Sequence, residues 1–229
     1  MRLVNIGICG LGTVGAGVFN VLGRNSQQIN SRANCDLVIA QLGARRDNPD
    51  CNTADINVTR DIFEVAKNPN IDIVVELIGG TDVAYELVMT ALDNGKHVVT
   101  ANKALIAQHG MEIFAAAEAR GLMVAYEAAV AGGIPIIKAL REGLSGNRIN
   151  WLAGIINGTT NFILSEMDSK GREFADVLTE AQEKGYAEAD PTFDVEGIDA
   201  AHKLVIMTSL AFGMPLSLDG IFTDGITRL

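Results

Sequence analysis

Residues 3–15 read LVNIGICGLGTVG, an apolar run followed by three glycines in the spacing Gly10-x-Gly12-x-x-Gly15. The apolar run predicts a buried strand, and the apolar residues beyond it recur at helical spacing. In such a strand–turn–helix unit, the three glycines permit a tight turn, a close backbone approach and close helix packing. The free N–H groups at the helix start suit a pyrophosphate. The stretch therefore predicts a dinucleotide-binding loop; the alternative is a tight turn without a ligand.

Strand and helix patterns alternate through the first 130 residues. Alternation of this kind implies right-handed crossovers and a mostly parallel sheet. We therefore expect an α/β fold with a Rossmann-type sheet. The expected strands are 3–9, 37–44, 71–78, 97–100 and 122–127, and the expected helices include 83–92 and 113–120, ended by Gly95 and Gly121.

The pattern changes after residue 131, and a domain boundary is expected at Gly132 and Gly133. Residues 1–132 would form the dinucleotide-binding domain and residues 133–229 a second, α+β domain. In the second domain we expect helices at 135–144, 161–168, 173–184 and 195–212, with one strand at 151–156.

Composition excludes several classes of protein. The net charge of -10 argues against a nucleic-acid partner, which needs a basic surface. No apolar run approaches the ~18 residues needed to cross a membrane, so no membrane association is expected. The three cysteines have no C-x-x-C spacing, which favours free thiols in a reducing cytoplasm.

The residues after the second strand bear on the choice of cofactor. A ribose 2′-OH is often bound there by Asp or Glu, whereas this chain has Arg45 and Arg46. Two guanidinium groups suit a 2′-phosphate, so NADP is favoured. Asp47 follows directly and would serve NAD, so NAD stays possible, and a solvated arginine pair is a third reading.

Charged residues in two other segments are candidates for chemistry. Lys103 follows a strand at the sheet edge where ligands of α/β folds bind; alone, it would read as a surface lysine opening a helix. Asp199 and Lys203 are four residues apart and share a helix face. Such a pair is often an exposed salt bridge worth under ~1 kcal/mol. Its apolar neighbours instead indicate a buried helix, where charges need partners or a function.

Taken together, these segments resemble homoserine dehydrogenase. The likeness runs the length of the chain and is carried by GLGTVG at 10–15, VVTANKALIA at 98–107, EAAVAGGIPII at 127–137, INGTTNFIL at 156–164 and GYAEADPTFDVEGIDAAHK at 185–203. That family interconverts L-aspartate 4-semialdehyde and L-homoserine with a nicotinamide cofactor, on the route to threonine and methionine.

The resemblance implies roles for individual residues. Lys203 would donate the proton to the carbonyl oxygen, Lys103 would be a second catalytic lysine near the nicotinamide, and Asp199 would belong to the same catalytic group. Glu188 and Asp199 would bind substrate, with Asp194 supporting them. The implied cofactor-binding residues are Gly10, Gly12, Thr13, Val14, Gly15, Arg45, Arg46, Lys103 and Gly185.

The resemblance further implies a monovalent cation, usually sodium, and a homodimer formed through the second domain. The cation's ligands would be the Glu127 side chain and the backbone carbonyls of Val130, Gly132 and Ile134; from the residues alone, this segment reads only as an irregular hinge. Family members continue well beyond Leu229, so we expect this chain to be truncated within its second domain.

Two rival functions have weaker support. A semialdehyde dehydrogenase with a thiol nucleophile would need a cysteine in the substrate domain, yet Cys9, Cys35 and Cys51 all precede residue 52. A non-catalytic nucleotide sensor would explain the glycine loop. It would leave the lysines and carboxylates at 103 and 188–203 unexplained.

Overall fold

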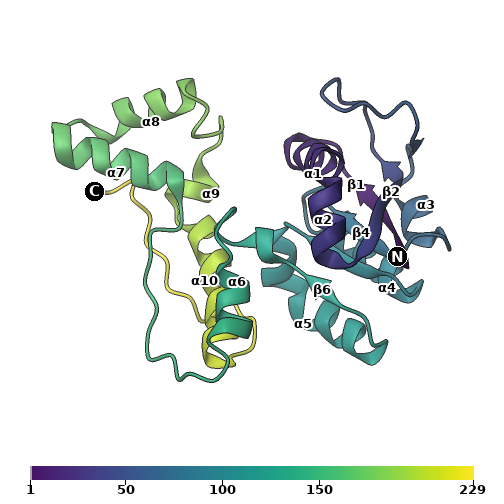
Figure 1. Cartoon of the computed structure of the whole chain (residues 1–229). Helices are drawn as coiled ribbons and strands as arrows, with labels where there is room; N and C mark the ends of the chain where they lie inside the picture. Colours follow the sequence, from purple (N-terminus) through teal and green to yellow (C-terminus); the bar gives the residue numbers. More distant parts are fainter. Residues whose placement is uncertain (1) are drawn as a thin grey trace. The chain divides into compact units, whose positions relative to one another are not determined.

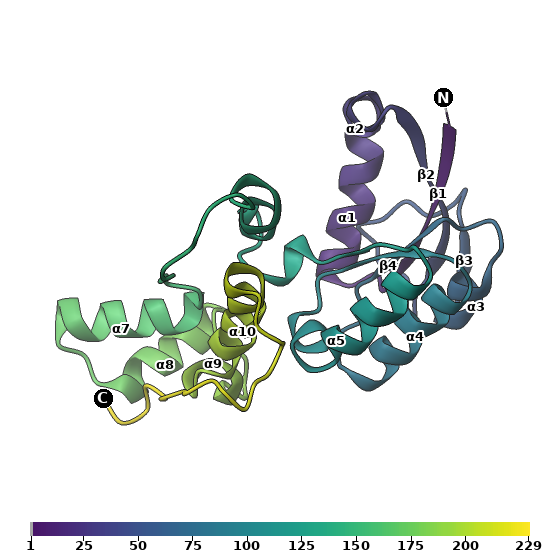
Figure 2. The ribbon, with the colours of Figure 1, turned by 90° about the horizontal axis from the view of Figure 1, so that it is seen from below.

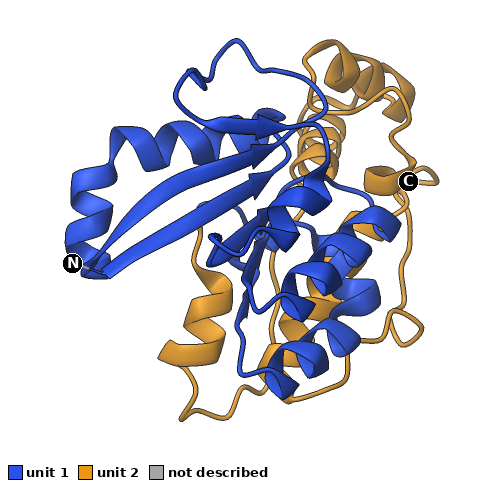
Figure 3. Cartoon of the chain, turned by 90° about the vertical axis from the view of Figure 1, so that its right-hand side faces the viewer, with its two compact units in different colours: residues 1–133 blue, residues 134–229 orange. Residues whose placement is uncertain are grey.

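The computed structural model describes residues 2–229, which divide into two compact units (Figure 3). Unit 1 is residues 1–133 and unit 2 is residues 134–229. Each unit has a hydrophobic core of its own. Within residues 2–229, no helix combines the length and the apolar character that crossing a bilayer requires.

A parallel six-stranded sheet forms the centre of unit 1 (Figure 1). The strand order is β3-β2-β1-β4-β5-β6, and every pair is parallel. This confirms the α/β fold class. The order reverses between β1 and β4, and ligands of open α/β sheets bind at such a switch point. The strands are β1 (Arg2–Cys9), β2 (Cys35–Gly43), β3 (Asn57–Thr59), β4 (Ile73–Glu76), β5 (His97–Thr100) and β6 (Val124–Ala125).

Helices cover both faces of this sheet (Figure 2). On one face, Ile6 and Ile8 of β1 pack with Phe19 of α1. On the other face, Cys9 and Val74 join a core built from α3, α4 and α5. The helices of unit 1 are α1 (Thr13–Arg24), α2 (Ser26–Ala33), α3 (Ile62–Lys67), α4 (Asp82–Asp93) and α5 (Lys103–Ala119), followed by a 3-10 turn η1 (Glu127–Ala129).

Two glycines allow α1 to start directly against the sheet. A Cβ on Gly15 would lie 2.0 Å from the Gly10 carbonyl oxygen, and a Cβ on Gly10 would lie 2.4 Å from the Leu77 carbonyl oxygen. Gly10 also has φ of 103°, a conformation that side chains disfavour. The tight turn and the close helix packing thus have separate steric causes.

The predicted boundaries in unit 1 need several corrections. The strands expected at 71–78 and 122–127 are shorter, because pairing is limited to Ile73–Glu76 and Val124–Ala125. The helix expected at 113–120 begins already at Lys103, where Asn102 caps it. Three short elements, α2, β3 and α3, were not predicted, because each is too short to show a recognisable apolar periodicity.

Unit 2 is built from helices in its described residues. Its core joins Ile163 of α7, Val177 and Ala181 of α8, Ala187, and Val195 of α9. The elements are α6 (Ile136–Lys138), which continues as a π-helical turn η2 (Ala139–Gly143), α7 (Gly158–Lys170), α8 (Phe174–Glu183), α9 (Thr192–Val195) and α10 (Ile198–Phe212).

Two predictions for unit 2 need correction. The helix expected at 195–212 is present but begins later, as α10 (Ile198–Phe212), because Gly197 with φ of 78° separates it from the short helix α9. The strand expected at 151–156 is not formed, and Trp151 and Ile155 are 76% and 82% exposed. A strand needs a partner for its backbone groups, and residues 134–229 as described supply no second strand.

We predict that Gly15→Ala lowers the free energy of unfolding by about 1–3 kcal/mol or more, because its methyl group would overlap the Gly10 carbonyl. Gly17→Ala is the matched control, since a Cβ at this exposed position of α1 meets no atom within 4 Å. Urea unfolding should show Gly17→Ala to be neutral or stabilising by about 0.5–1 kcal/mol. Equal effects of the two substitutions would contradict the steric explanation.

Candidate functional site

The carboxyl edge of the sheet gathers the candidate cofactor residues of unit 1. Cys9 pairs with Gly43 on one side and with Glu76 on the other, and Glu76 pairs with Thr100. The four strands β2, β1, β4 and β5 therefore end in one row. The segments that leave this row carry the glycine turn, Arg45 and Arg46, and Lys103.

The glycine turn offers an open, electropositive helix end. Gly12 is the N-cap of α1, no side chain caps this helix, and its first turn has no acidic residue. A Cβ on Gly12 would meet no atom within 4 Å, so the space in front of it is open. Thr13 and Val14 at the helix start are exposed. Free N–H groups facing open space suit a phosphate.

Arg45 and Arg46 lie beside this turn and are exposed. Their segment is anchored where Asn48 donates from Nδ2 to the Leu11 carbonyl, 2.9 Å away. The Gly10 N–H donates to the Gly43 carbonyl at 2.8 Å, which brings the ends of β1 and β2 together. The two arginines thus follow a strand end that is tied directly to the glycine turn.

Arg60 is a residue that sequence reasoning missed. Its guanidinium donates to the Ala44 carbonyl at 2.9 Å and pairs with Asp47 at 2.7 Å. Asp47, the acid that would serve NAD, is therefore engaged by a third arginine. Arg60 follows the short strand β3, and no sequence signal linked it to Asp47 thirteen positions away.

Cys9 lies buried at the end of β1, directly before the turn. Burial, and secondarily the nearby Glu76 carboxylate, raises the pKa of its thiol to about 12. Its Sγ also contacts the Ile62 carbonyl at 3.7 Å. A thiol with so high a pKa is a poor nucleophile, which agrees with the argument against thiol catalysis.

In unit 2, Lys203 and Asp199 of α10 form a close pair. The Lys203 Nζ lies 2.6 Å from Asp199 Oδ2 and 2.5 Å from the Ile156 carbonyl oxygen. Asp199 is 4% exposed. The pair is thus partly withdrawn from solvent, unlike an ordinary surface salt bridge.

Asn157 joins Asp199 to Asp194, and sequence reasoning assigned it no role. Its Nδ2 donates to Asp194 Oδ1 at 2.7 Å and to Asp199 Oδ2 at 2.8 Å. Its Oδ1 accepts the Thr160 N–H at 2.8 Å and so caps α7. An Asn directly before a helix is a capping signal that would have marked the position. One amide therefore orients two carboxylates from two helices.

Gly185 and Glu188 lie in the exposed segment after α8, outside this cluster. Gln182 donates from Nε2 to the Glu188 carbonyl at 3.1 Å, and Thr159 donates to the Tyr186 carbonyl at 2.7 Å. These bonds attach the segment to the ends of α7 and α8.

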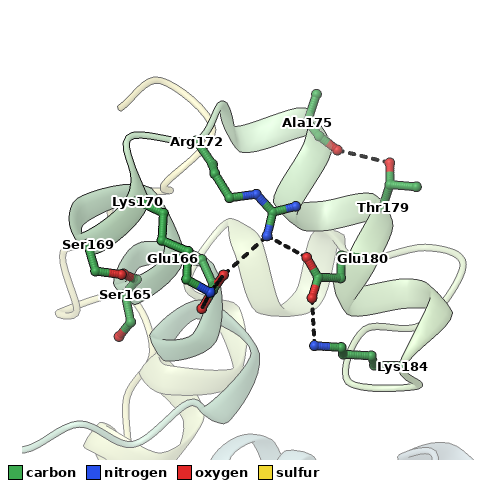
Figure 4. Close-up of polar contacts among 9 residues, drawn as sticks. All are labelled: Ser165, Glu166, Ser169, Lys170, Arg172, Ala175, Thr179, Glu180 and Lys184. Atoms are coloured by element: carbon green, nitrogen blue, oxygen red, sulfur yellow. Dashed lines mark hydrogen bonds and ion pairs between the residues drawn. The ribbon is translucent and has the colours of Figure 1, made fainter.

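An ion-pair network joins α7 to α8 ahead of that segment (Figure 4). Arg172 contacts both Glu166 and Glu180, while Lys170 pairs with Glu166 and Lys184 with Glu180. Hydrogen bonds from Lys184 and then Arg172 lower the pKa of Glu180 to about 2. The carboxylate therefore stays charged across the neutral range.

The remaining sequence-predicted residues lie in three places. Lys103 is the first residue of α5 in unit 1. Glu127 opens the 3-10 turn, and Val130 and Gly132 follow in an irregular segment where Ala131 and Gly133 have positive φ. Ile134 begins unit 2, and its carbonyl accepts the Ile136 N–H at 2.8 Å. Within residues 2–229, no cluster of three His, Cys, Asp or Glu side chains forms a metal site.

Two family models match the chain. The model for the NAD-binding domain of homoserine dehydrogenase matches residues 10–127, and the homoserine dehydrogenase model matches residues 135–229. A homoserine dehydrogenase of Pseudomonas aeruginosa is 68% identical over 100% of this chain, which covers 53% of that relative. The chain thus spans about half the length of the curated relatives it matches.

Solved structures similar to this chain are also homoserine dehydrogenases. A homoserine dehydrogenase from Thiobacillus denitrificans is 59% identical with a TM-score of 0.94, over 100% of this chain and 53% of its own. A hyperthermophilic archaeal homoserine dehydrogenase in complex with NADPH is 29% identical with a TM-score of 0.81, over 93% of this chain and 71% of its own.

We predict that Asn157→Ala lowers the free energy of unfolding by about 1–3 kcal/mol, because it removes a helix cap and two hydrogen bonds to carboxylates. Asn157→Asp keeps the capping ability but places a third carboxylate against Asp194 and Asp199. Urea unfolding at neutral pH should therefore show Asn157→Asp to be at least as destabilised as Asn157→Ala. A stability equal to that of the parent chain for Asn157→Asp would mean that the amide does not bridge the two acids.

Proposed function

Because the chain belongs to the homoserine dehydrogenase family, we propose that its protein interconverts L-aspartate 4-semialdehyde and L-homoserine with NADP(H). The observation that carries this proposal is the Lys203 ammonium held between Asp199 and the Ile156 carbonyl, beside the bridged acid Asp194. Reduction of the aldehyde needs a proton donor, and the substrate's ammonium group needs carboxylates that bind it. This cluster has both.

Lys203 is the proposed proton donor. An ammonium has three N–H groups, and Asp199 and the Ile156 carbonyl are two acceptors for them. A further N–H then points to the substrate carbonyl oxygen, which becomes basic as the aldehyde is reduced. The nicotinamide, when bound, supplies the hydride to the aldehyde carbon. In the reverse direction, Lys203 receives the proton of the alcohol.

Three acidic residues of unit 2 are the proposed substrate ligands and their support. The substrate carries an ammonium group, and carboxylates bind ammonium through charge-assisted hydrogen bonds. Asp199 and Glu188 take this role, and Asp194 supports it through Asn157. Lys103, at the start of α5, is proposed as the second lysine, near the nicotinamide.

The preference for NADP rests on the arginines after β2. Arg45 and Arg46 are exposed beside the glycine turn, and the competing acid Asp47 is paired with Arg60. Positive charge at this position favours a ribose 2′-phosphate over a free 2′-OH. The archaeal neighbour, whose structure holds NADPH, supports the same choice. Gly10, Gly12, Thr13, Val14 and Gly15 then bind the pyrophosphate, and Gly185 contacts the cofactor.

Further parts of the proposal come from the family resemblance. A sodium ion would be held by the Glu127 carboxylate and the carbonyls of Val130, Gly132 and Ile134, in a segment whose positive φ values turn its backbone sharply. The NAD-binding model over residues 10–127 supports residues 1–132 as the cofactor-binding domain. From the family resemblance alone, residues 133–229 would bind substrate and form a homodimer. We further propose that the protein lies in the cytoplasm and that its reaction belongs to the biosynthesis of threonine and methionine.

We predict that Lys203→Ala lowers kcat by about 10²–10⁴-fold, the usual contribution of a general acid. NADPH affinity should be unchanged, because Lys203 is not among the residues proposed to bind the cofactor. The measurement is NADPH oxidation with L-aspartate 4-semialdehyde, on this chain and on a chain extended to the length of its relatives. Near-normal turnover of Lys203→Ala in an active parent would overturn the assignment; an inactive extended parent would overturn the enzyme proposal itself.

We predict that the double substitution Arg45→Ala, Arg46→Ala weakens NADPH binding about tenfold or more, because it removes charge-assisted bonds to the 2′-phosphate. NADH lacks that phosphate, so its affinity should change little. The double substitution Arg24→Ala, Arg32→Ala, at exposed arginines of α1 and α2, is the matched control for loss of two charges. Titration calorimetry with both cofactors measures these affinities. An equal loss of affinity for NADPH and NADH would remove the argument for NADP.

A further inference from the structure

Glu76 is a fully buried carboxylate for which the proposed mechanism has no use. It is the last residue of β4 and is 0% exposed, at the carboxyl edge of the sheet beside the strand-order reversal. A buried acid is costly unless donors surround it, so its partners indicate its role.

Three donors from two neighbouring segments meet at Glu76. Its Oε1 accepts the N–H groups of Ile78 at 2.9 Å and Gly79 at 3.3 Å. Its Oε2 accepts the Thr100 hydroxyl at 2.5 Å. Both oxygens act as acceptors, which is the pattern of an ionised carboxylate. A glutamine has only one acceptor oxygen and an alanine has none.

The contacts continue from Thr100 to the start of α5 and back. Thr100 Oγ1 accepts the Asn102 N–H at 2.9 Å. Asn102 then donates from Nδ2 to the Gly80 carbonyl at 2.6 Å and caps α5 by accepting the Leu105 N–H at 3.1 Å. Glu76, the segment 77–80, Asn102 and Thr100 therefore form a closed ring of contacts, which we call the Glu76 ring.

The Glu76 ring links two parts of the proposed cofactor site. On one side, the Leu77 N–H donates to the Cys9 carbonyl at 2.8 Å, and the Leu77 carbonyl adjoins Gly10 of the glycine turn. On the other side, Asn102 directly precedes Lys103. The ring thereby fixes the spacing between the turn that binds phosphate and the lysine proposed to lie near the nicotinamide.

We propose that Glu76 is a positioning residue for the nicotinamide half of the cofactor, acting through the segment 77–80 and the start of α5. This inference rests on the proposed function, since it requires that the site binds a dinucleotide. The adenosine half lies beyond the ring, toward Arg45 and Arg46 at the end of β2, and depends on it far less.

The experiment compares two ligands on each variant of this chain. NADPH occupies both halves of the site, whereas adenosine 2′,5′-bisphosphate occupies only the adenosine half. Calorimetry should show that Glu76→Ala weakens NADPH about tenfold or more and adenosine 2′,5′-bisphosphate less than about twofold. Glu76→Gln, which keeps an acceptor for the Ile78 and Gly79 N–H groups, should lie much closer to the parent chain.

Two further variants separate positioning from general destabilisation. Gln41→Ala is the matched control, because it removes another buried polar side chain of unit 1, one that bonds Asn68 at 2.7 Å away from the ring. It should leave the ratio of the two affinities unchanged. If Glu76→Ala does not fold, Thr100→Val decides, since it preserves shape but removes the hydroxyl that donates to Glu76 and accepts the Asn102 N–H. It should selectively weaken NADPH.

Each outcome bears on a different claim. Equal weakening of both ligands by Glu76→Ala or Thr100→Val, or no weakening at all, overturns the positioning role. A parent chain that binds NADPH no more tightly than adenosine 2′,5′-bisphosphate also overturns it. A parent chain that binds neither ligand contradicts the proposed function itself.

Discussion

The close approach of α1 to the end of β1 is the constraint on which the arrangement of unit 1 depends. Gly15 and Gly10 leave no room for side chains between the helix, the turn and the Leu77 carbonyl. The turn therefore packs against the segment that directly follows β4, and the uncapped end of α1 opens at the strand-order reversal. Arg45 and Arg46 follow one adjoining strand, and Lys103 follows the strand beyond β4. The two glycine contacts and the strand order together thus place the cofactor candidates of unit 1 at one edge of the sheet.

Local sequence signals predicted most of this unit. A strand buried on both faces, a glycine spacing and an amphipathic helix are each encoded by neighbouring residues, so β1, α1 and α4 were recognisable. Residues 151–156 show the limit of such signals. Their apolar content suits a strand, but pairing depends on residues elsewhere in the fold, and none of the described residues of unit 2 provides it.

The polar contacts behind the candidate sites were less predictable for a related reason. Asn157 bonds both Asp194 and Asp199, which lie about forty positions further along the chain, and Glu76 of β4 accepts a hydrogen bond from Thr100 of the neighbouring strand β5. Family resemblance implied catalytic roles for Lys203 and Asp199. It did not point to Asn157 or Glu76, because a hydrogen bond between distant segments leaves no pattern along the chain.

Cys9 gives the glycine turn a chemical property of its own. Burial raises the pKa of its thiol to about 12, so the thiol stays protonated at neutral pH. Oxidants and alkylating reagents act on thiolates, so they would reach this sulfur only when β1 separates from its neighbours. Reaction of Cys9 with such reagents would therefore report that the sheet has opened, and no reaction is expected while the fold is intact.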